Sequence, residues 1–277
     1  MRLLFLLILV GAQALAAEIA TRDTVSISTI ATIDGVAKTS LSTVDGLTVP
    51  SGGGGGGSPP TYINGSVTDF SSTASPTLNN PSSPTANDIW LLTITTDSAH
   101  DTSGTPPGDW EELHQINITD GDSSSTTFWK RASGSEGATE AWPNIFAASE
   151  VGKAIIVVYR GCKTSGSPFN TSATDQSPSS EGQPKAVGPA TTTVNNCIAV
   201  VIFASDPGSS TTRSFTFDVG LDSRVNLGTT PNGSGNANGY IFIADKVIAT
   251  AGGTGSLGGS LDASDTSAEF LYALEPQ

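Results

Sequence analysis

Six consecutive glycines, Gly52–Gly57, followed by a serine and two prolines, interrupt the chain after its first fifty residues. Glycine loses more conformational freedom on folding than any other residue and buries no side chain, so such a run favours a flexible linker. A linker over residues 51–60 would span roughly 16–19 Å on average. It divides the chain into an N-terminal segment, residues 18–50, predicted to serve attachment or assembly, and a body, residues 61–277.

The beginning of the chain has the pattern of a secretory signal peptide. Arg2 precedes an apolar stretch, residues 3–10, and small residues follow up to Ala17. This pattern is typical of exported chains, and the stretch is too short for a membrane anchor. The alternative is a buried N-terminal strand or helix. We expect residues 1–17 to be removed, leaving no membrane span, and the protein to be secreted, at an extracellular surface or on a virion.

Composition narrows the class of protein. The net charge is −14, and the basic residues are not clustered, so nucleic-acid binding is not expected. Charged residues make up only 14% of the chain, and Ser and Thr supply about a quarter of it. This bias is typical of extracellular β-proteins, and the body is long enough to bury a sizeable core.

The two cysteines, Cys162 and Cys197, each stand at the end of an apolar run predicted as a strand. An even pair in an exported chain predicts a disulfide, which would close a loop of about 36 residues and stabilise the fold by roughly 3–4 kcal/mol. The alternatives are two free buried thiols or a metal pair, and the absence of a neighbouring His in the sequence disfavours a zinc site.

Residues 24–49 contain an internal repeat, in which Thr32–Val36 resembles Thr43–Leu47 and each copy carries Asp-Gly. Asp-Gly between β-branched residues predicts a two-residue hairpin turn, so we expect a three-strand meander. A ribbon this small is marginal in water, so it should pair with the body, with a scaffold or, by self-association, with identical copies. The alternative is a disordered leader.

The body alternates short apolar stretches with Gly, Pro, Ser, Asn and Asp, and it contains no convincing amphipathic helix. This pattern predicts an all-β fold, an antiparallel β-sandwich that is jelly-roll-like. Residues 163–194, with several prolines and many Ser and Thr, are predicted as a surface loop. The predicted strands are residues 61–70, 88–95, 110–117, 126–131, 153–160, 197–204, 214–219, 240–248 and 268–274.

Five short motifs in the body together resemble those of a known kind of domain. They are Asn87–Leu92, Thr105–Trp110, Phe128–Ala132, Val157–Gly161 and Ala190–Thr193. Over about residues 85–205 this succession resembles a widespread β-sandwich domain of phage and virus structural proteins and of secreted bacterial surface proteins. In that domain a glycine is usually followed directly by a tryptophan, whereas in this chain Asp109 separates Gly108 from Trp110. The Asp-Gly repeats also resemble N-terminal repeats of some phage structural proteins. The resemblance implies a surface or virion setting and carries no known set of catalytic residues.

Candidate catalytic groups are few. His100 and His114 are the histidine bases, and neither lies in a catalytic motif. Glu111-Glu112 would point to opposite faces of a strand and so cannot flank one glycosidic bond. Gly253–Gly258 matches a dinucleotide-binding spacing, but the following Gly-Ser argues against a helix, and a hairpin loop is expected. We therefore expect no enzymatic activity.

The sequence also contains residues that could contact a ligand or a metal ion, although no motif supports them. Trp110 follows turn residues and Trp142 precedes a proline, and both are candidate ligand contacts because indole rings stack on sugars. The alternative for both is packing in the core, which is expected for Trp90 and Trp129. No cofactor is expected other than Ca²⁺, for which acidic loops offer oxygen ligands without the EF-hand spacing. The acidic loop residues are Asp120, Asp122, Asp262 and Asp265, and the Asn-x-Ser/Thr triplets begin at Asn64, Asn117, Asn170 and Asn232.

These patterns predict a non-enzymatic, exported or virion-surface structural or attachment protein. Its N-terminal repeat would serve assembly, and its tethered β-sandwich would serve display or adhesion. The alternative is a secreted carbohydrate-binding module that contacts a cell-surface glycan through Trp110 and Trp142. A secreted hydrolase with an unrecognised site is a third hypothesis, since the absence of a motif is weak evidence.

Overall fold

The computed structural model divides the chain into two units, residues 1–55 and 56–277, and each is described by itself. The predicted signal peptide and residues 51–56 of the predicted linker lie outside the residues that the structure describes. These residues are 32–33, 36–37, 43–44, 47–48, 57–97, 104–118, 123–177, 185–205, 213–227, 239–262 and 266–277.

The described part of the N-terminal unit consists of two short hairpin ladders. Strand β1 (Thr32–Ile33) pairs antiparallel with β2 (Val36–Ala37), and β3 (Thr43–Val44) pairs antiparallel with β4 (Leu47–Thr48). Each pair flanks an Asp-Gly dipeptide, so the hairpin prediction is confirmed. Within the described residues the strands form two separate pairs, and the prediction of one three-strand meander is wrong.

All nine strands predicted in the body are present, and the all-β, antiparallel sandwich fold is confirmed. They are β5 (Thr61–Thr73), β7 (Ile89–Thr96), β8 (Glu111–Asn117), β9 (Ser124–Arg131), β11 (Glu150–Arg160), β14 (Cys197–Ser205), β15 (Phe215–Phe217), β17 (Tyr240–Ile248) and β19 (Ser267–Leu274). The strands β7, β11, β14, β17 and β19 are largely apolar because they are buried on both faces, whereas β5 and β8 are more polar and more exposed.

The remaining strands are short or polar and were not predicted. Two of them lie within residues 163–194, so the prediction of a surface loop there is wrong. Another begins inside the stretch 253–258, which is therefore not simply a hairpin loop. The additional strands are β6 (Thr77–Asn79), β10 (Thr139–Ala141), β12 (Phe169–Ser177), β13 (Lys185–Val187), β16 (Asp222–Leu227) and β18 (Leu257–Leu261).

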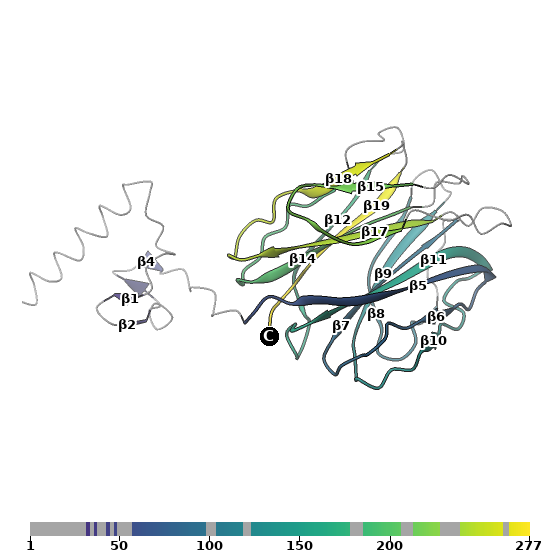
Figure 1. Ribbon diagram of the computed structural model, residues 1–277, viewed down its shortest axis with the longest axis horizontal. Helices are drawn as coiled ribbons and strands as arrows, with labels where there is room; N and C mark the ends of the chain where they lie inside the picture. Colours follow the sequence, from purple (N-terminus) through teal and green to yellow (C-terminus); the bar gives the residue numbers. More distant parts are fainter. Residues whose placement is uncertain are drawn as a thin grey trace, which may run out of the picture. The chain divides into compact units, whose positions relative to one another are not determined.

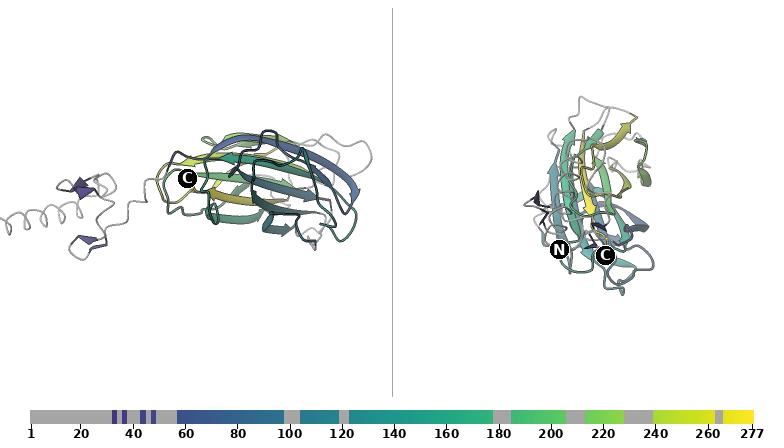
Figure 2. Two further views of the ribbon diagram at one scale, coloured as in Figure 1. Left: turned by 90° about the horizontal axis from the view of Figure 1, so that it is seen from below. Right: turned by 90° about the vertical axis from the view of Figure 1, so that its left-hand side faces the viewer.

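Two five-stranded antiparallel sheets form the centre of the body (Figure 1). The first sheet has the order β5-β11-β7-β9-β8, and the second has the order β12-β19-β14-β17-β16. Their inner faces pack together through a buried apolar cluster that includes Leu91 and Val157 of the first sheet and Val200 and Ile243 of the second. Figure 2 shows the blue and teal strands of the first sheet beside the green and yellow strands of the second.

The outer face of each sheet is also covered. The β6–β10 pair and its neighbouring loops contribute to an apolar cluster with Trp90 and Phe128 on the first sheet. The three-stranded sheet β13-β18-β15 covers Phe203 and Phe242 on the second. Burial on both faces explains why every residue of β7 and β19 is buried.

The two halves of the body follow the same strand path. In each half the first strand pairs with the last, the last with the third, and the second strand pairs with the last but one, away from the five-stranded sheet. The connections that precede β7 and β14, residues 80–88 and 188–196, are both nine residues long. The second half differs by the inserted strand β15. This order does not confirm the predicted jelly roll; it shows two copies of one path.

The same irregularities recur in both halves. A bulge lies between Glu112 and His114 on β8 and between Ser223 and Val225 on β16, and a second bulge lies near the start of both β5 and β12. Because the registers agree, individual residues correspond. The pairs used below are Tyr62 with Phe169, Asp222 with Glu111, Arg224 with Leu113 and Asp245 with Trp129.

The start of β5 and the last residues of the chain lie at one end of the body, here named the tether pole (Figure 1). Asn196 Nδ2 donates to the carbonyl of Gly57 at 3.2 Å, and the N–H of Gln277 donates to the carbonyl of Gly161 at 2.8 Å. A Cβ on Gly57 would lie 2.2 Å from the Gln277 oxygen. Residues 57–60, predicted as the end of the linker, are therefore packed against the body, and Pro60 is buried.

The predicted disulfide is absent, because Cys162 and Cys197 are two free, buried thiols. Cys162 belongs to the cluster between the two five-stranded sheets, whereas Cys197 lies in the cluster on the outer face of the second sheet. A sheet therefore separates the two sulfur atoms. Cys197 Sγ instead donates to the carbonyl of Val194 at 3.3 Å.

We expect neither thiol to react with a thiol-specific reagent in the native protein at neutral pH. Burial raises the pKa of Cys162 to about 12 and that of Cys197 to about 11, so the reactive thiolate is scarce. A spectrophotometric thiol assay without reductant should count none before unfolding in urea and two afterwards. A count of none in the unfolded chain would instead establish a disulfide.

Candidate functional site

Trp110 and Trp142, predicted as ligand contacts, are core residues. Their exposed fractions are 4% and 0%, and their ring centroids lie 5.4 Å apart. Trp142 also packs on Phe128 at 5.1 Å, and Trp110 Nε1 donates to Glu140 at 2.8 Å. The cluster under β6 and β10 encloses both indoles, so the prediction that they contact a surface ligand is wrong.

His114 joins the two halves instead of standing free as a base. Its Nδ1 lies 3.1 Å from the hydroxyl of Tyr272, which also contacts the hydroxyl of Thr127. Burial lowers the pKa of His114 below its ordinary value. The folded protein therefore favours the neutral imidazole. His100 lies outside the described residues.

We expect the body to lose stability as the pH falls below about 6.5, the ordinary pKa of histidine. The unfolded chain takes up a proton on His114 in this range, whereas the folded chain takes it up only below its lowered pKa, so protonation favours unfolding. The melting temperature should fall more between pH 7.5 and 5.5 for the wild type than for His114→Asn, which keeps a polar group and does not titrate. Equal falls in both proteins would contradict this role.

The remaining sequence candidates form no site. Glu111 and Glu112 are exposed on the edge strand β8. Asp262 Oδ2 accepts hydrogen bonds from the N–H and hydroxyl of Ser214, while Asp120, Asp122 and Asp265 lie outside the described residues. No group of three or more metal-ligating side chains occurs among the described residues.

In two of the Asn-x-Ser/Thr triplets the asparagine side-chain amide already donates hydrogen bonds within the protein. Asn64 Nδ2 donates to Ser82, and Asn170 Nδ2 donates to Thr193 and Glu275. Asn117 is exposed at the end of β8, so it is the accessible member among the described triplets. Asn232 lies outside the described residues.

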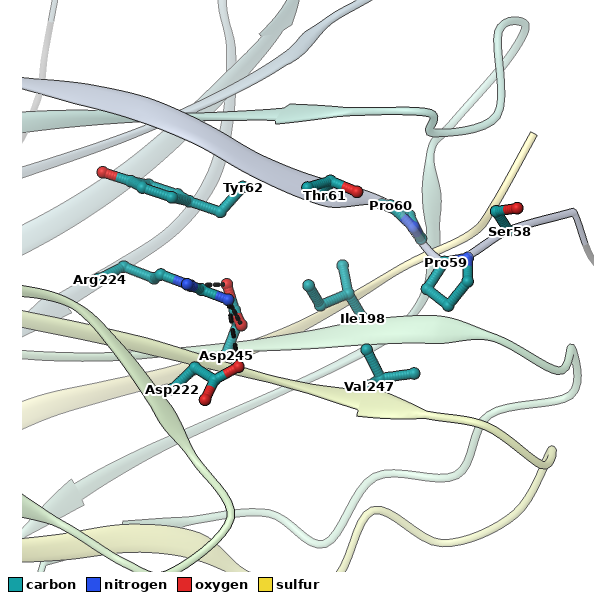
Figure 3. A pocket seen from close by; sticks show the side chains of 10 residues that line it. All are labelled: Ser58, Pro59, Pro60, Thr61, Tyr62, Ile198, Asp222, Arg224, Asp245 and Val247. Atoms are coloured by element: carbon teal, nitrogen blue, oxygen red, sulfur yellow. Dashed lines mark hydrogen bonds and ion pairs between the residues drawn. The ribbon is translucent and has the colours of Figure 1, made fainter.

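One candidate site is a pocket of about 320 Å³ beside the tether pole, between the edge strand β5 and the strands β16 and β17 (Figure 3). Pro59, Pro60 and Tyr62 form one wall. Ile198 and Val247 form the floor, and charged side chains form the opposite wall. Residues from both halves of the body and from the end of the predicted linker thus meet here.

The charged wall is built around Asp245, whose side chain is 2% exposed. Arg224 donates to its carboxylate through Nε at 2.7 Å and through Nη2 at 2.9 Å. The Tyr159 hydroxyl donates to the same carboxylate at 2.9 Å. Arg224 Nη2 also reaches Asp222 at 3.3 Å, so one guanidinium holds two carboxylates.

Protonation states in the pocket are fixed by these contacts. The hydrogen bond and negative charge of Asp245 raise the pKa of Arg224, so the guanidinium stays charged. Burial, followed by the charge of Asp245, raises the pKa of Tyr159 well above its usual value, and burial also raises the pKa of Tyr62. Both phenols are therefore neutral in ordinary buffers, and Tyr159 remains a hydrogen-bond donor.

Tyr62 covers the ion pair from the side of β5. The Arg224 guanidinium carbon lies 5.3 Å from the centre of the Tyr62 ring, and Tyr159 meets the same ring edge-on at 5.9 Å. This cation–π contact restrains the guanidinium further. The Arg224 guanidinium and the Asp245 carboxylate are consequently held in place before any ligand arrives.

The corresponding position on the opposite side of the sandwich is closed by apolar groups. There Trp129 packs edge-on against Phe169 at 5.4 Å, and Leu113 packs against the same core. The two halves share one strand path, yet the first half has an indole at Trp129 where the second half has the Arg224–Asp245 pair. The fold itself therefore does not require the charged wall.

Sequence reasoning missed this pocket entirely. Its residues come from positions as far apart as Tyr62 and Asp245, and no short motif contains them. One signal was present, because Asp245 interrupts the apolar run of β17, where a buried carboxylate requires a partner.

Comparison of the chain with known protein families, with curated proteins and with solved structures finds no match. Among the described residues there is no helix with the length and apolar character needed to cross a membrane.

Proposed function

We propose that this protein is a non-enzymatic structural or attachment protein, exported or carried on a virion, whose N-terminal unit assembles and whose body is displayed. The observation that carries the proposal is the contrast between the two units. The described strands of the N-terminal unit form ladders of two residue pairs each, whereas the body contains three buried apolar clusters. Ladders this short are not stable alone and need an added partner strand.

The arrangement of the body supports display. Residue 57 and residue 277 both lie at the tether pole, and β5, β7, β12 and β14 all run from this pole towards the opposite one. Attachment through the preceding segment therefore leaves the opposite pole unobstructed by the chain's own tether. The resemblance to domains of phage and bacterial surface proteins agrees with this role.

The proposal is tested by the size of the assembled chain. Light scattering and negative-stain microscopy should find trimers or larger assemblies for residues 18–277 and monomers after deletion of residues 18–50. Val36→Pro with Leu47→Pro, which removes ladder donors without shortening the chain, should also give monomers. Circular dichroism should show an unchanged body in both variants. A monomeric parent chain, or variants that still assemble, would overturn the proposal.

A further inference from the structure

The pocket between β5 and β16 lies beside a polar pair where the other side of the sandwich has an aromatic ring. Asp245 stands at the position that corresponds to Trp129, and the Arg224–Asp245 pair lines the pocket in place of an indole. At about 320 Å³ the pocket lies at the small end of ligand sites, which usually measure about 300–1,000 Å³. Its size therefore suits a group of one or two rings.

A donor that is held in place and an exposed acceptor stand side by side in this pocket. Arg224 is held by Asp245, Asp222 and Tyr62, yet its Nη1 group has no hydrogen-bond partner among the described residues. The Asp222 side chain is 75% exposed and has lone pairs available. The guanidinium can donate to one hydroxyl of a sugar ring, and the carboxylate beside it can accept from the neighbouring hydroxyl.

Apolar surface gathers beside these polar groups. Val247, which lies in the pocket, is 46% exposed, and Val219, three residues before Asp222, is fully exposed. They are the exposed large hydrophobic residues found among the described part of the chain. An exposed apolar residue in a pocket is typical of binding surfaces, and Val247 with Pro59 offers contact to the C–H face of a ring.

The charge of the pocket selects against anions. One guanidinium faces two carboxylates, so the local balance is negative, and the chain as a whole carries a net charge of −14. Phosphate groups and acidic sugars would be repelled, whereas a neutral polyhydroxyl ring would not.

We propose that this pocket binds a neutral sugar ring at the end of an oligosaccharide. Asp222 and the Nη1 group of Arg224 would bind neighbouring hydroxyls, and Val247 and Pro59 would contact the ring. The inference rests on the proposed attachment function, because it names the class of target to which the displayed body would bind. It replaces the expected contacts at Trp110 and Trp142 with a different surface.

The test is a titration of the full chain with neutral oligosaccharides, namely maltotriose, cellotriose, chitotriose, mannotriose and lactose, followed by saturation-transfer NMR and calorimetry. We expect saturable binding of at least one of them, with a Kd in the millimolar range or tighter. If lactose binds, 3′-sialyllactose should bind at least about tenfold more weakly because of its charge. Absence of saturable binding across the neutral panel would overturn the inference.

Three variants locate the site. Asp222→Ala should weaken binding about tenfold, since it removes a charged acceptor, and Val247→Trp should abolish binding by filling the gap. Glu111→Ala, at the corresponding position on the closed side, should leave binding unchanged. Both mutated pocket residues are exposed, so folding should be preserved. Binding that survives Asp222→Ala and Val247→Trp would overturn the assignment to this pocket.

The outcomes separate this inference from the proposed function. A chain that assembles through residues 24–49 and binds no neutral saccharide would overturn the sugar site alone. A chain that binds saccharide at the pocket and remains monomeric would overturn the assembly function alone.

Discussion

Asp245→Ala should destabilise the body by about 3 kcal/mol, which is the lower end of the range for breaking a buried ion pair. The substitution leaves the Tyr159 hydroxyl and the Arg224 guanidinium without the carboxylate that both now bind. Arg224 is 28% exposed, so water can partly compensate it, and this places the loss at the lower end. Urea unfolding monitored by tryptophan fluorescence would measure the change.

Two matched variants make the result specific. Asp222→Ala removes a carboxylate from the same guanidinium, but its side chain is 75% exposed, so the loss should be below about 0.5 kcal/mol. Tyr159→Phe keeps the ring packing and removes one hydrogen bond, which should cost about 1 kcal/mol. An Asp245→Ala protein within about 1 kcal/mol of the wild type would show that the pair contributes little to stability.

Trp142→Ala should cost about 3–5 kcal/mol, the usual range for truncating a fully buried aromatic side chain. The indole is 0% exposed and fills the space between Trp110 and Phe128 under the β6–β10 pair. One side of the cavity left by truncation would be formed by Trp90, Phe128 and Ile156 on the central strands of the first sheet, which cannot move to fill it.

Thermal and urea unfolding of Trp142→Ala should be compared with Val219→Ala, which truncates an apolar side chain that is fully exposed. We expect the second variant to unfold like the wild type. A Trp142→Ala protein as stable as the wild type would show that the indole contributes little to the packing under β6 and β10.

The sequence predicts the central strands well because burial makes most of them apolar, and of the edge strands of the two large sheets it predicts β5 and β8 but not β12 and β16. Strand β12 reads Phe-Asn-Thr-Ser-Ala-Thr-Asp-Gln-Ser and carries few apolar residues, because it lies at the edge of its sheet. The strands β6, β10 and β13 are three residues long, which is too short for any periodicity to appear.

The wrong disulfide has a related cause. Apolar runs located Cys162 and Cys197 correctly at strand ends, but a strand that is buried on both faces shows no alternation. The sequence of β14 therefore contains no indication of which face Cys197 occupies, and only the pairing of whole sheets places it opposite to Cys162.

The candidate site depends on the same long-range information. The burial of Trp142 follows from β6 pairing with β10, sixty residues later in the chain. The pocket follows from the first half of the body packing against the second, which brings Tyr62 to Arg224. No local sequence pattern predicts either of these packing arrangements. The one local indication is Asp245, because a carboxylate inside an apolar strand requires a buried partner.

The position of residue 57 beside residue 277 also determines how the body would bear mechanical force. A pull between these two residues would act on neighbouring points, so it would open backbone hydrogen bonds one after another from the tether pole. A pull between residue 57 and the opposite pole would act along β5, whose long ladder with β11 would be loaded in shear as a unit. The body should therefore resist tension along β5 far better than tension between its own ends.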